Sequence, residues 1–136
     1  MSKEKPTVQS FMSTNVETIS AQKTLKEAIS IMQIKKIRHL PVVMGDQVVG
    51  IISDRDIKAA LSMDGVDPAK SPVHYFCKDA VYIVSPDMPL DKVAESMAQS
   101  HYGSAVVMKD SKLVGILTLV DICKALSYII RVQFHS

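Results

Sequence analysis

Apolar residues follow two different spacings in the first half of the chain. In the segment 25–32 they stand three or four positions apart, which is the period of one helix face. The runs 39–44 and 47–52 are rich in β-branched residues, which is typical of strands. Gly45 and Asp46 separate the two runs and fit a tight hairpin turn, because glycine tolerates a positive φ. The pattern predicts a helix followed by a β-hairpin.

Two further elements flank these three. Residues 16–19 form a short strand-like segment before the helix, and the apolar spacing of residues 57–61 indicates a second helix after the hairpin. Thr24 and Glu27 resemble a capping box, with a hydroxyl at the helix start and a carboxylate three positions on. The order is therefore strand, helix, strand, strand, helix.

The same order returns after 65 positions, the separation between Gly50 and Gly115, and residues 8–62 align to the second copy without a gap. Identical residues are mostly apolar, as expected for a shared core, with Gly, Ser/Thr and Asp as exceptions. One copy is a supersecondary unit that does not bury its apolar face alone. We predict repeats at 8–62 and 73–130, joined by a linker at 63–72 that is rich in turn signals.

The second repeat has its own signals. Pro89 suits the first turn of a helix, whose apolar stripe covers 90–97. Residues 105–108 and 113–117 form the second hairpin, and the last helix begins near 121 and runs through 130. The predicted fold class is α/β of the α+β type, made of two β-α-β-β-α units.

Composition narrows the classes of function. The chain has 136 residues, of which 47% are hydrophobic and 22% charged, as in a soluble globular domain. A net charge of +2 is too small to favour nucleic acid or an anionic membrane as partner. No apolar run reaches the ~20 residues of a membrane helix, and residues 1–6 lack the apolar stretch of a signal peptide. Two cysteines that do not match across the repeat indicate reduced thiols and a cytoplasmic location.

Candidate chemistry lies where each hairpin meets the following helix. Ser53 and Asp56 stand there in the first repeat, and Thr118 and Asp121 in the second. Such pairs are typical helix caps, with the hydroxyl accepting a backbone N–H. The same geometry also suits a nucleotide, because a helix N-terminus favours phosphate and a carboxylate accepts ribose hydroxyls. The Ser/Thr and Asp pair occurs twice, each time after Gly-Ile-Ile/Leu. This recurrence makes a nucleotide site a competitive alternative to a simple helix cap.

Catalytic and metal sites are not predicted. His74, His101 and His135 show no metal-ligand spacing with cysteines or acidic residues. Cys77 matches Met12 in the other repeat, which favours a small core residue over a nucleophile. No Ser-His-Asp or Cys-His set is visible, so we expect a protein that is not an enzyme.

Three motifs together identify a resemblance. They are Ile37-Arg38-His39-Leu40-Pro41-Val42-Val43, the duplicated Gly-h-h-Ser/Thr-x-x-Asp (h, apolar), and the openings Phe11-Met12-Ser13-Thr14-Asn15-Val16 and Phe76-Cys77-Lys78-Asp79-Ala80-Val81. The chain resembles a tandem pair of cystathionine-β-synthase (CBS) domains, a Bateman module. The resemblance implies pseudo-twofold symmetry, sheets packed face to face, and two clefts for AMP, ADP, ATP, S-adenosylmethionine or similar ligands. It implies sensing, with no obligatory cofactor.

The resemblance also implies which residues bind ligand. One cleft combines Thr118 and Asp121 with Asn15, Val16, Ile37, Arg38 and His39. The other combines Ser53 and Asp56 with Ala80, Val81, Tyr102, Gly103 and Ser104. Arg38 is able to pair with a phosphate in the first cleft, whereas the matching positions of the second cleft carry no cation. The alternative for Arg38 and His39 is a solvated strand entry.

The sequence thus predicts a regulatory module that binds an adenosine-containing small molecule and acts on an effector protein that the sequence does not identify. The alternative is a structural module whose clefts are vestigial and which acts through dimerisation. In either case we expect a homodimer, because two helices carry apolar faces that one module does not fully cover. These faces are Ile57/Ala60/Leu61 and Ile122/Ala125/Leu126/Ile129.

Overall fold

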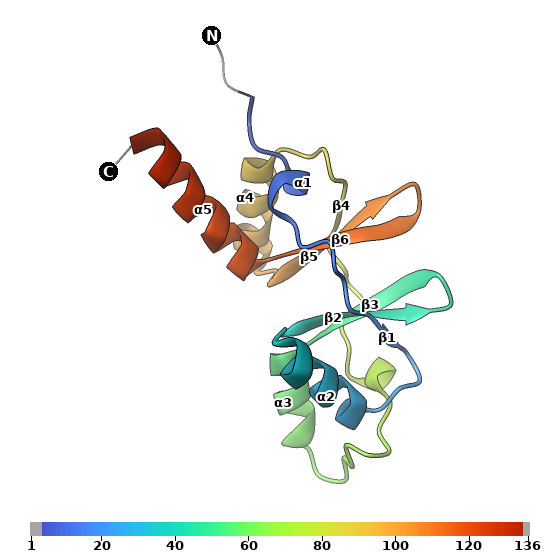
Figure 1. Ribbon diagram of the computed structural model, residues 1–136. Coiled ribbons are helices and arrows are strands. Elements are labelled where there is room, and N and C mark those ends of the chain that lie inside the picture. Colours follow the sequence, from blue (N-terminus) through green and yellow to red (C-terminus); the bar gives the residue numbers. More distant parts are fainter. Residues whose placement is uncertain (1–3, 135–136) are drawn as a thin grey trace. The chain divides into compact units, whose positions relative to one another are not determined.

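The computed structural model describes residues 4–134, which fall into two compact units (Figure 1). Unit 1 combines the chain up to Val16 with the chain from Tyr82 onward. Unit 2 is the continuous segment Glu17–Val81. Each unit is a three-stranded sheet with helices, which confirms the predicted mixture of α and β structure.

Unit 2 contains the elements that the first half of the sequence predicted, but its first strand, Ile19–Ser20, overlaps the predicted segment 16–19 only at Ile19. Its sheet has the order β1-β2-β3, with β1 parallel and β3 antiparallel to β2. Gly45 opens the turn of the β2–β3 hairpin with φ of +59°. The elements are β1 (Ile19–Ser20), α2 (Leu25–Lys35), β2 (His39–Met44), β3 (Gln47–Ser53), α3 (Asp54–Leu61) and the 3₁₀ turn η1 (Val73–Tyr75).

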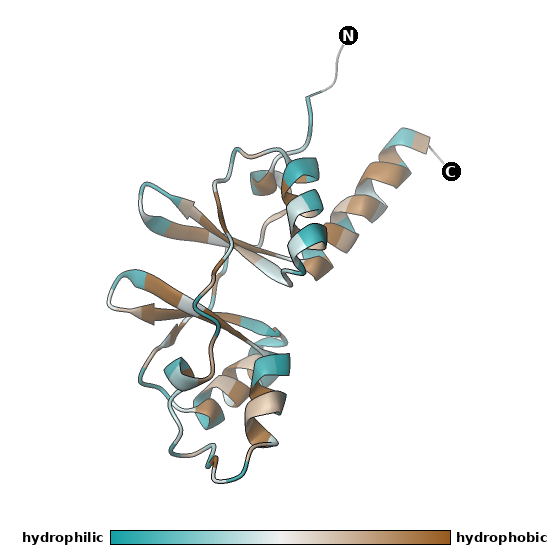
Figure 2. Cartoon of the chain, turned by 180° about the vertical axis from the view of Figure 1, so that it is seen from behind, coloured by the Kyte–Doolittle hydropathy of each residue, from teal (hydrophilic) through white to brown (hydrophobic). Residues whose placement is uncertain are grey.

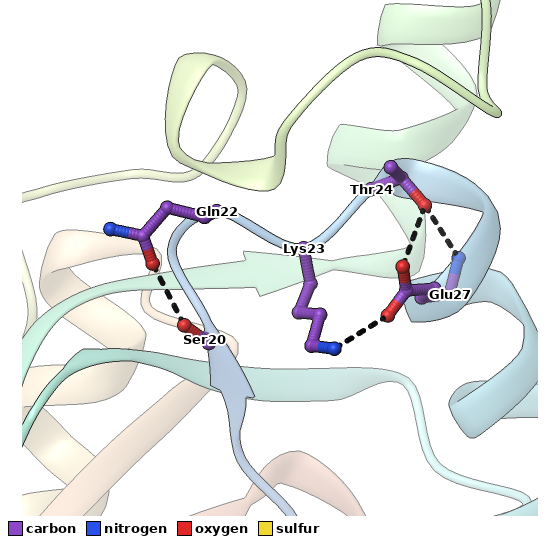
Figure 3. A network of polar contacts seen from close by, with 5 residues as sticks. All are labelled: Ser20, Gln22, Lys23, Thr24 and Glu27. Carbon is purple, nitrogen blue, oxygen red and sulfur yellow. Dashed lines mark hydrogen bonds and ion pairs between the residues drawn. The ribbon is translucent and has the colours of Figure 1, made fainter.

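Helix α2 begins where the capping signal predicted (Figure 3). The hydroxyl of Thr24 accepts the Glu27 backbone N–H at 3.3 Å. The Glu27 carboxylate, however, accepts from that hydroxyl at 3.5 Å and lies 3.5 Å from the Lys23 ammonium. Only one half of the predicted box forms, because the carboxylate has side-chain partners instead of the Thr24 backbone N–H.

Unit 1 repeats the arrangement with the sheet order β4-β5-β6. Pro89 lies at the N-cap of α4, one position before the predicted first turn. Helix α5 begins before residue 121 and extends beyond residue 130, so it is longer than predicted. The elements are α1 (Val8–Phe11), β4 (Ile83–Val84), α4 (Leu90–Ser100), β5 (Ser104–Lys109), β6 (Lys112–Thr118) and α5 (Leu119–Phe134).

The opening segment of each repeat packs against a sheet of the other repeat. In unit 1, Ser13 exchanges backbone hydrogen bonds of 2.9 and 3.0 Å with Ile116 on the edge strand β6. In unit 2, Lys78 exchanges hydrogen bonds of 2.8 and 2.9 Å with Ile51 on β3. The compact units are therefore not the same segments as the sequence repeats.

This docking explains the two glycines of the repeated motif. A Cβ at Gly50 would lie 2.7 Å from Cys77 Sγ and 2.8 Å from the Lys78 carbonyl oxygen. A Cβ at Gly115 would lie 2.6 Å from Met12 Sδ. A side chain at either glycine would force the atoms of the docked opening segment to shift.

Each unit has its own apolar core, and three residues expected on uncovered helix faces lie inside these cores. Ile57 and Ala60 are buried in unit 2, and Ala125 is buried in unit 1. The expectation was wrong for them because their side chains pack against the sheet of their own unit. Leu61 and Leu126, at the matching ends of the two faces, are exposed.

Helix α5 carries many apolar residues, with polar and charged residues interspersed along it (Figure 2). Leu126 and Phe134 are 58% and 72% exposed, and other large apolar residues of this helix are also exposed. Within residues 4–134, no helix combines the length and apolar character required to span a membrane.

Candidate functional site

The junction of β6 and α5 holds a buried carboxylate. Asp121 Oδ2 accepts the Thr118 backbone N–H at 2.9 Å and the Thr118 hydroxyl at 3.1 Å. The same hydroxyl accepts the Asp121 backbone N–H at 3.3 Å. Asp121 is only 7% exposed. The cap interpretation of this pair is therefore correct, and it fixes one carboxylate oxygen at the start of the helix.

The second oxygen of this carboxylate has a partner that the sequence analysis missed. Ser13, on the docked opening segment, donates its hydroxyl to Asp121 Oδ1 at 3.2 Å and to Oδ2 at 3.5 Å. The residues are 108 positions apart, so no local pattern joins them. The duplication offers only an indirect signal, namely that Ser13 belongs to an opening motif that occurs twice.

The junction of β3 and α3 has the same cap. Ser53 Oγ accepts the Asp56 backbone N–H at 3.1 Å, and Asp56 Oδ2 accepts the Ser53 backbone N–H at 2.9 Å. This is a reciprocal capping box at the first turn of the helix. Each repeat therefore presents a carboxylate held by the backbone where a strand ends and a helix begins.

Asp56 has a cationic neighbour that was also missed. The Lys78 ammonium lies 3.8 Å from Asp56 Oδ1. The Asp56 side chain is 12% exposed and the Lys78 side chain 70% exposed. Lys78 matches Ser13 after the shift of 65 positions, so the repeat alignment was the signal that could have found it.

Arg38 and His39 lie beside Ser53 within unit 2. His39 pairs with Ser53 in the β2–β3 register, and the Arg38 carbonyl accepts the Asp54 N–H at 2.9 Å. Burial lowers the pKa of His39, which the negative charge of Asp56 partly opposes and the positive charge of Arg38 reinforces. The hairpin register brings these basic residues to the Ser53 junction, a neighbourhood that the sequence analysis did not describe.

The remaining predicted residues divide between the units. Asn15, Val16, Tyr102, Gly103 and Ser104 belong to unit 1, where Leu119 N–H donates to the Gly103 carbonyl at 3.2 Å and Ser104 pairs with Thr118. Ile37, Ala80 and Val81 belong to unit 2. Each residue set that the resemblance assigns to a cleft therefore draws on both units, and that pairing stays a prediction.

Tyr102 has a structural partner. Its ring stacks on Tyr82 within unit 1, with ring centroids 4.8 Å apart and an interplanar angle of 14°. An adenine would have to replace this contact or use another surface of the ring. The stacking favours a contribution of Tyr102 to the core of unit 1, against which its side chain packs.

A concavity of about 400 Å³ lies in unit 2 between α2 and α3. Its lining combines apolar side chains with the cations Lys36 and Arg38 and the carboxylate of Asp54. Ile37 is its other predicted site residue. The lining consists of Ile29, Met32, Gln33, Lys36, Ile37, Arg38, Asp54 and Ile57.

Metal-binding chemistry has no support among the described residues. Residues 4–134 contain no group of three His, Cys, Asp or Glu side chains placed to hold a metal ion. His135 lies outside the described residues. Burial raises the pKa of the Cys77 thiol, which disfavours the reactive thiolate.

The matched segments decide the family. The model of the CBS domain matches residues 8–63 and again 73–128. The chain belongs to the CBS domain family. It carries the domain as a tandem pair, and the duplicated Gly-h-h-Ser/Thr-x-x-Asp motif falls once in each matched segment.

Relatives of this CBS pair include proteins of similar length. The CBS domain-containing protein YhcV of Bacillus subtilis is 30% identical over 115 residues, which cover 85% of this chain and 81% of YhcV. A Vibrio cholerae protein assigned to acetoin utilization, AcuB, has a structure that matches with a TM-score of 0.85 at 27% identity and 98% coverage of both chains.

One structural relative contains adenosine compounds. The CBS pair of protein MJ0100 matches with a TM-score of 0.84 at 27% identity, covering 93% of this chain and 99% of that one. Its crystal structure is a complex with 5′-methylthioadenosine and S-adenosylmethionine.

Proposed function

We propose that this CBS pair is a non-catalytic regulatory module that binds adenosine-containing ligands, such as AMP, ADP, ATP or S-adenosylmethionine. The observation that carries the proposal is the duplicated carboxylate. Asp56 and Asp121 are each fixed by backbone hydrogen bonds at a helix start, with one oxygen held only by side chains. The adenosine compounds bound by the CBS pair of MJ0100 support the same ligand class.

The chemistry of the two junctions suits a nucleoside. A carboxylate oxygen accepts ribose hydroxyls, and helix N-termini favour anionic groups. The guanidinium of Arg38 provides two parallel donors for a phosphate. Following the resemblance, we propose that Thr118 and Asp121 act together with Arg38 and His39, and that Ser53 and Asp56 act with the segment around Gly103.

A ligand regulates only if it binds two states of the protein with different affinity. We propose that the ligand stabilises one arrangement of the CBS pair and that an effector protein recognises it. Two free cysteines, Cys77 and Cys123, suit the reducing cytoplasm, which we propose as the location.

Titration calorimetry and thermal unfolding test the proposal. AMP, ADP, ATP, S-adenosylmethionine and cyclic di-AMP would be screened separately. A ligand that binds only the folded state adds about 2.7 kcal/mol to the free energy of unfolding at 100 times its dissociation constant. No heat and no thermal shift with any of the five compounds would contradict the proposal.

A second function is favoured by two observations. Each cap hydroxyl and one oxygen of each cap carboxylate already have hydrogen-bond partners within the protein, and α5 exposes several large apolar side chains. Both fit a structural module that acts through dimerisation alone. We propose a homodimer that uses the exposed face of α5 under either function. A measurement of ligand binding distinguishes the two functions.

A further inference from the structure

Lys78 and Ser13 hold equivalent positions in the repeat but present different groups to the two carboxylates. The Lys78 ammonium lies 3.8 Å from Asp56 Oδ1. At the equivalent place in unit 1, the Ser13 hydroxyl donates to Asp121 Oδ1 at 3.2 Å. The partner of the carboxylate is therefore cationic in unit 2 and neutral in unit 1.

The backbone places both side chains in the same way. Ser13 and Lys78 each exchange two backbone hydrogen bonds with an edge strand, so the side chain at this position is directed to the carboxylate of the following helix. The fold fixes the position, whereas the residue there differs between the two repeats. A difference at this position changes the charge of the site without changing the cap.

The Lys78 ammonium is free to exchange its partner. Its side chain is 70% exposed, and a lysine stem is long and flexible. Asp56 Oδ2 is occupied by the Ser53 backbone N–H at 2.9 Å, which leaves Oδ1 for other donors. A ligand hydroxyl that binds Oδ1 therefore competes with Lys78. A phosphate on the same ligand gives the displaced ammonium a new anionic partner.

On the basis of the proposed adenosine binding, we infer that Lys78 is a specificity residue that favours phosphorylated over unphosphorylated adenosine ligands at Asp56. An unphosphorylated ligand breaks the ion pair between Lys78 and Asp56 and leaves the ammonium without an anionic partner. A phosphorylated ligand exchanges one ion pair for another. Asp121, whose partner is the neutral hydroxyl of Ser13, has no such preference from this position.

Two other titratable side chains near Asp56, those of His39 and Asp54, do not account for the exchange. His39 lies within electrostatic range of the carboxylate, and its pKa is lowered by burial, so its neutral form is favoured near pH 7. Asp54 is paired with Lys58 at 3.1 Å. Among residues 4–134, the ion pair found for Asp56 is the one with Lys78.

The test compares the affinities for AMP and adenosine in matched variants. Lys78→Ser introduces the residue of the equivalent position, and Ser13→Lys is the reciprocal change. Lys70→Ser removes an exposed lysine elsewhere in unit 2 and controls for net charge. We expect Lys78→Ser to lower the ratio of AMP affinity to adenosine affinity about fivefold, the upper end for an exposed ion pair. We expect Ser13→Lys to raise the ratio and Lys70→Ser to leave it within twofold.

The outcomes separate this inference from the proposed function. If the wild type binds both compounds but Lys78→Ser leaves the ratio unchanged, or Lys70→Ser lowers it equally, the role of Lys78 is refuted and adenosine binding stands. If the wild type binds neither compound, the proposed function fails and the inference fails with it. If Ser13→Lys does not fold, the comparison of Lys78→Ser with Lys70→Ser decides whether Lys78 sets the preference for AMP over adenosine.

Discussion

Asp56 and Asp121 occupy the same place in the two units, yet their surroundings differ in a specific way. Both accept a backbone N–H at 2.9 Å from the residue that caps their helix. The remaining oxygen meets an ammonium in unit 2 and a hydroxyl in unit 1. The comparison shows that duplication preserved the backbone contacts, which the fold requires, while the side chain beside the carboxylate changed.

The docked segments also differ in how tightly they hold the glycines. A Cβ at Gly50 would lie 2.8 Å from a backbone oxygen, which has little freedom to move. A Cβ at Gly115 would mainly meet the flexible side chain of Met12. We expect Gly50→Ala to lower the free energy of unfolding by about 2–3 kcal/mol and Gly115→Ala by about 1 kcal/mol. Urea denaturation followed by circular dichroism measures both. Equal losses in the two variants would show that the segments are equally free to shift.

The two units differ again in the helices that follow the capped carboxylates. Leu61 and Leu126 are equivalent, but α3 ends at Leu61 whereas α5 continues to Phe134 with exposed apolar residues. We expect Leu126→Glu to raise the dimer dissociation constant about thirtyfold, ~2 kcal/mol, because a charge would enter the apolar face. Leu61→Glu is the matched control, with a smaller expected effect. Analytical ultracentrifugation of the 15.0 kDa chain measures both constants. A monomeric wild type, or equal effects of the two variants, would exclude α5 as the main interface.

The smallest expected difference concerns pH. Burial lowers the pKa of His39 below its ordinary value of 6.5, whereas the equivalent Ser104 does not titrate. The unfolded chain therefore binds a proton at this residue more readily than the folded one, and stability decreases as the pH falls below about 6.5. His39→Ser should reduce this acid destabilisation. Chemical denaturation at pH 7.5 and pH 5.5 checks it, and an unchanged pH dependence in the variant would assign the acid sensitivity to other groups.

Much of the fold follows from local sequence signals. The hairpin of β2 and β3 was predicted because β-branched runs flank Gly45. The starts of three helices were predicted because Thr24, Ser53 and Thr118 are capping residues. Helix α1 and the 3₁₀ turn η1 were not predicted, since four and three residues are too short for a period to be recognised. The length of α5 was underestimated because the apolar pattern weakens after Ile130.

The candidate site was only partly accessible from the sequence. The caps were visible because their members stand three residues apart. The partners Ser13 and Lys78 could not be predicted. Their contacts depend on opening segments that dock on a strand of the other repeat, and nothing in the local pattern specifies which edge strand they join. The repeat alignment carries the missing information once one of the two contacts is known.

Native mass spectrometry tests the central claim most directly. The wild type and the double variant Asp56→Asn/Asp121→Asn would be purified side by side without added nucleotide and then incubated with equimolar AMP, ATP and S-adenosylmethionine. Asparagine retains an oxygen that accepts the cap N–H, but it removes the anionic acceptor for the ribose hydroxyls. We predict that the folded wild type carries the mass of an adenosine ligand and that the folded double variant loses most of it. Equal occupancy in the two proteins, or a wild type without any adenosine ligand, would contradict the account.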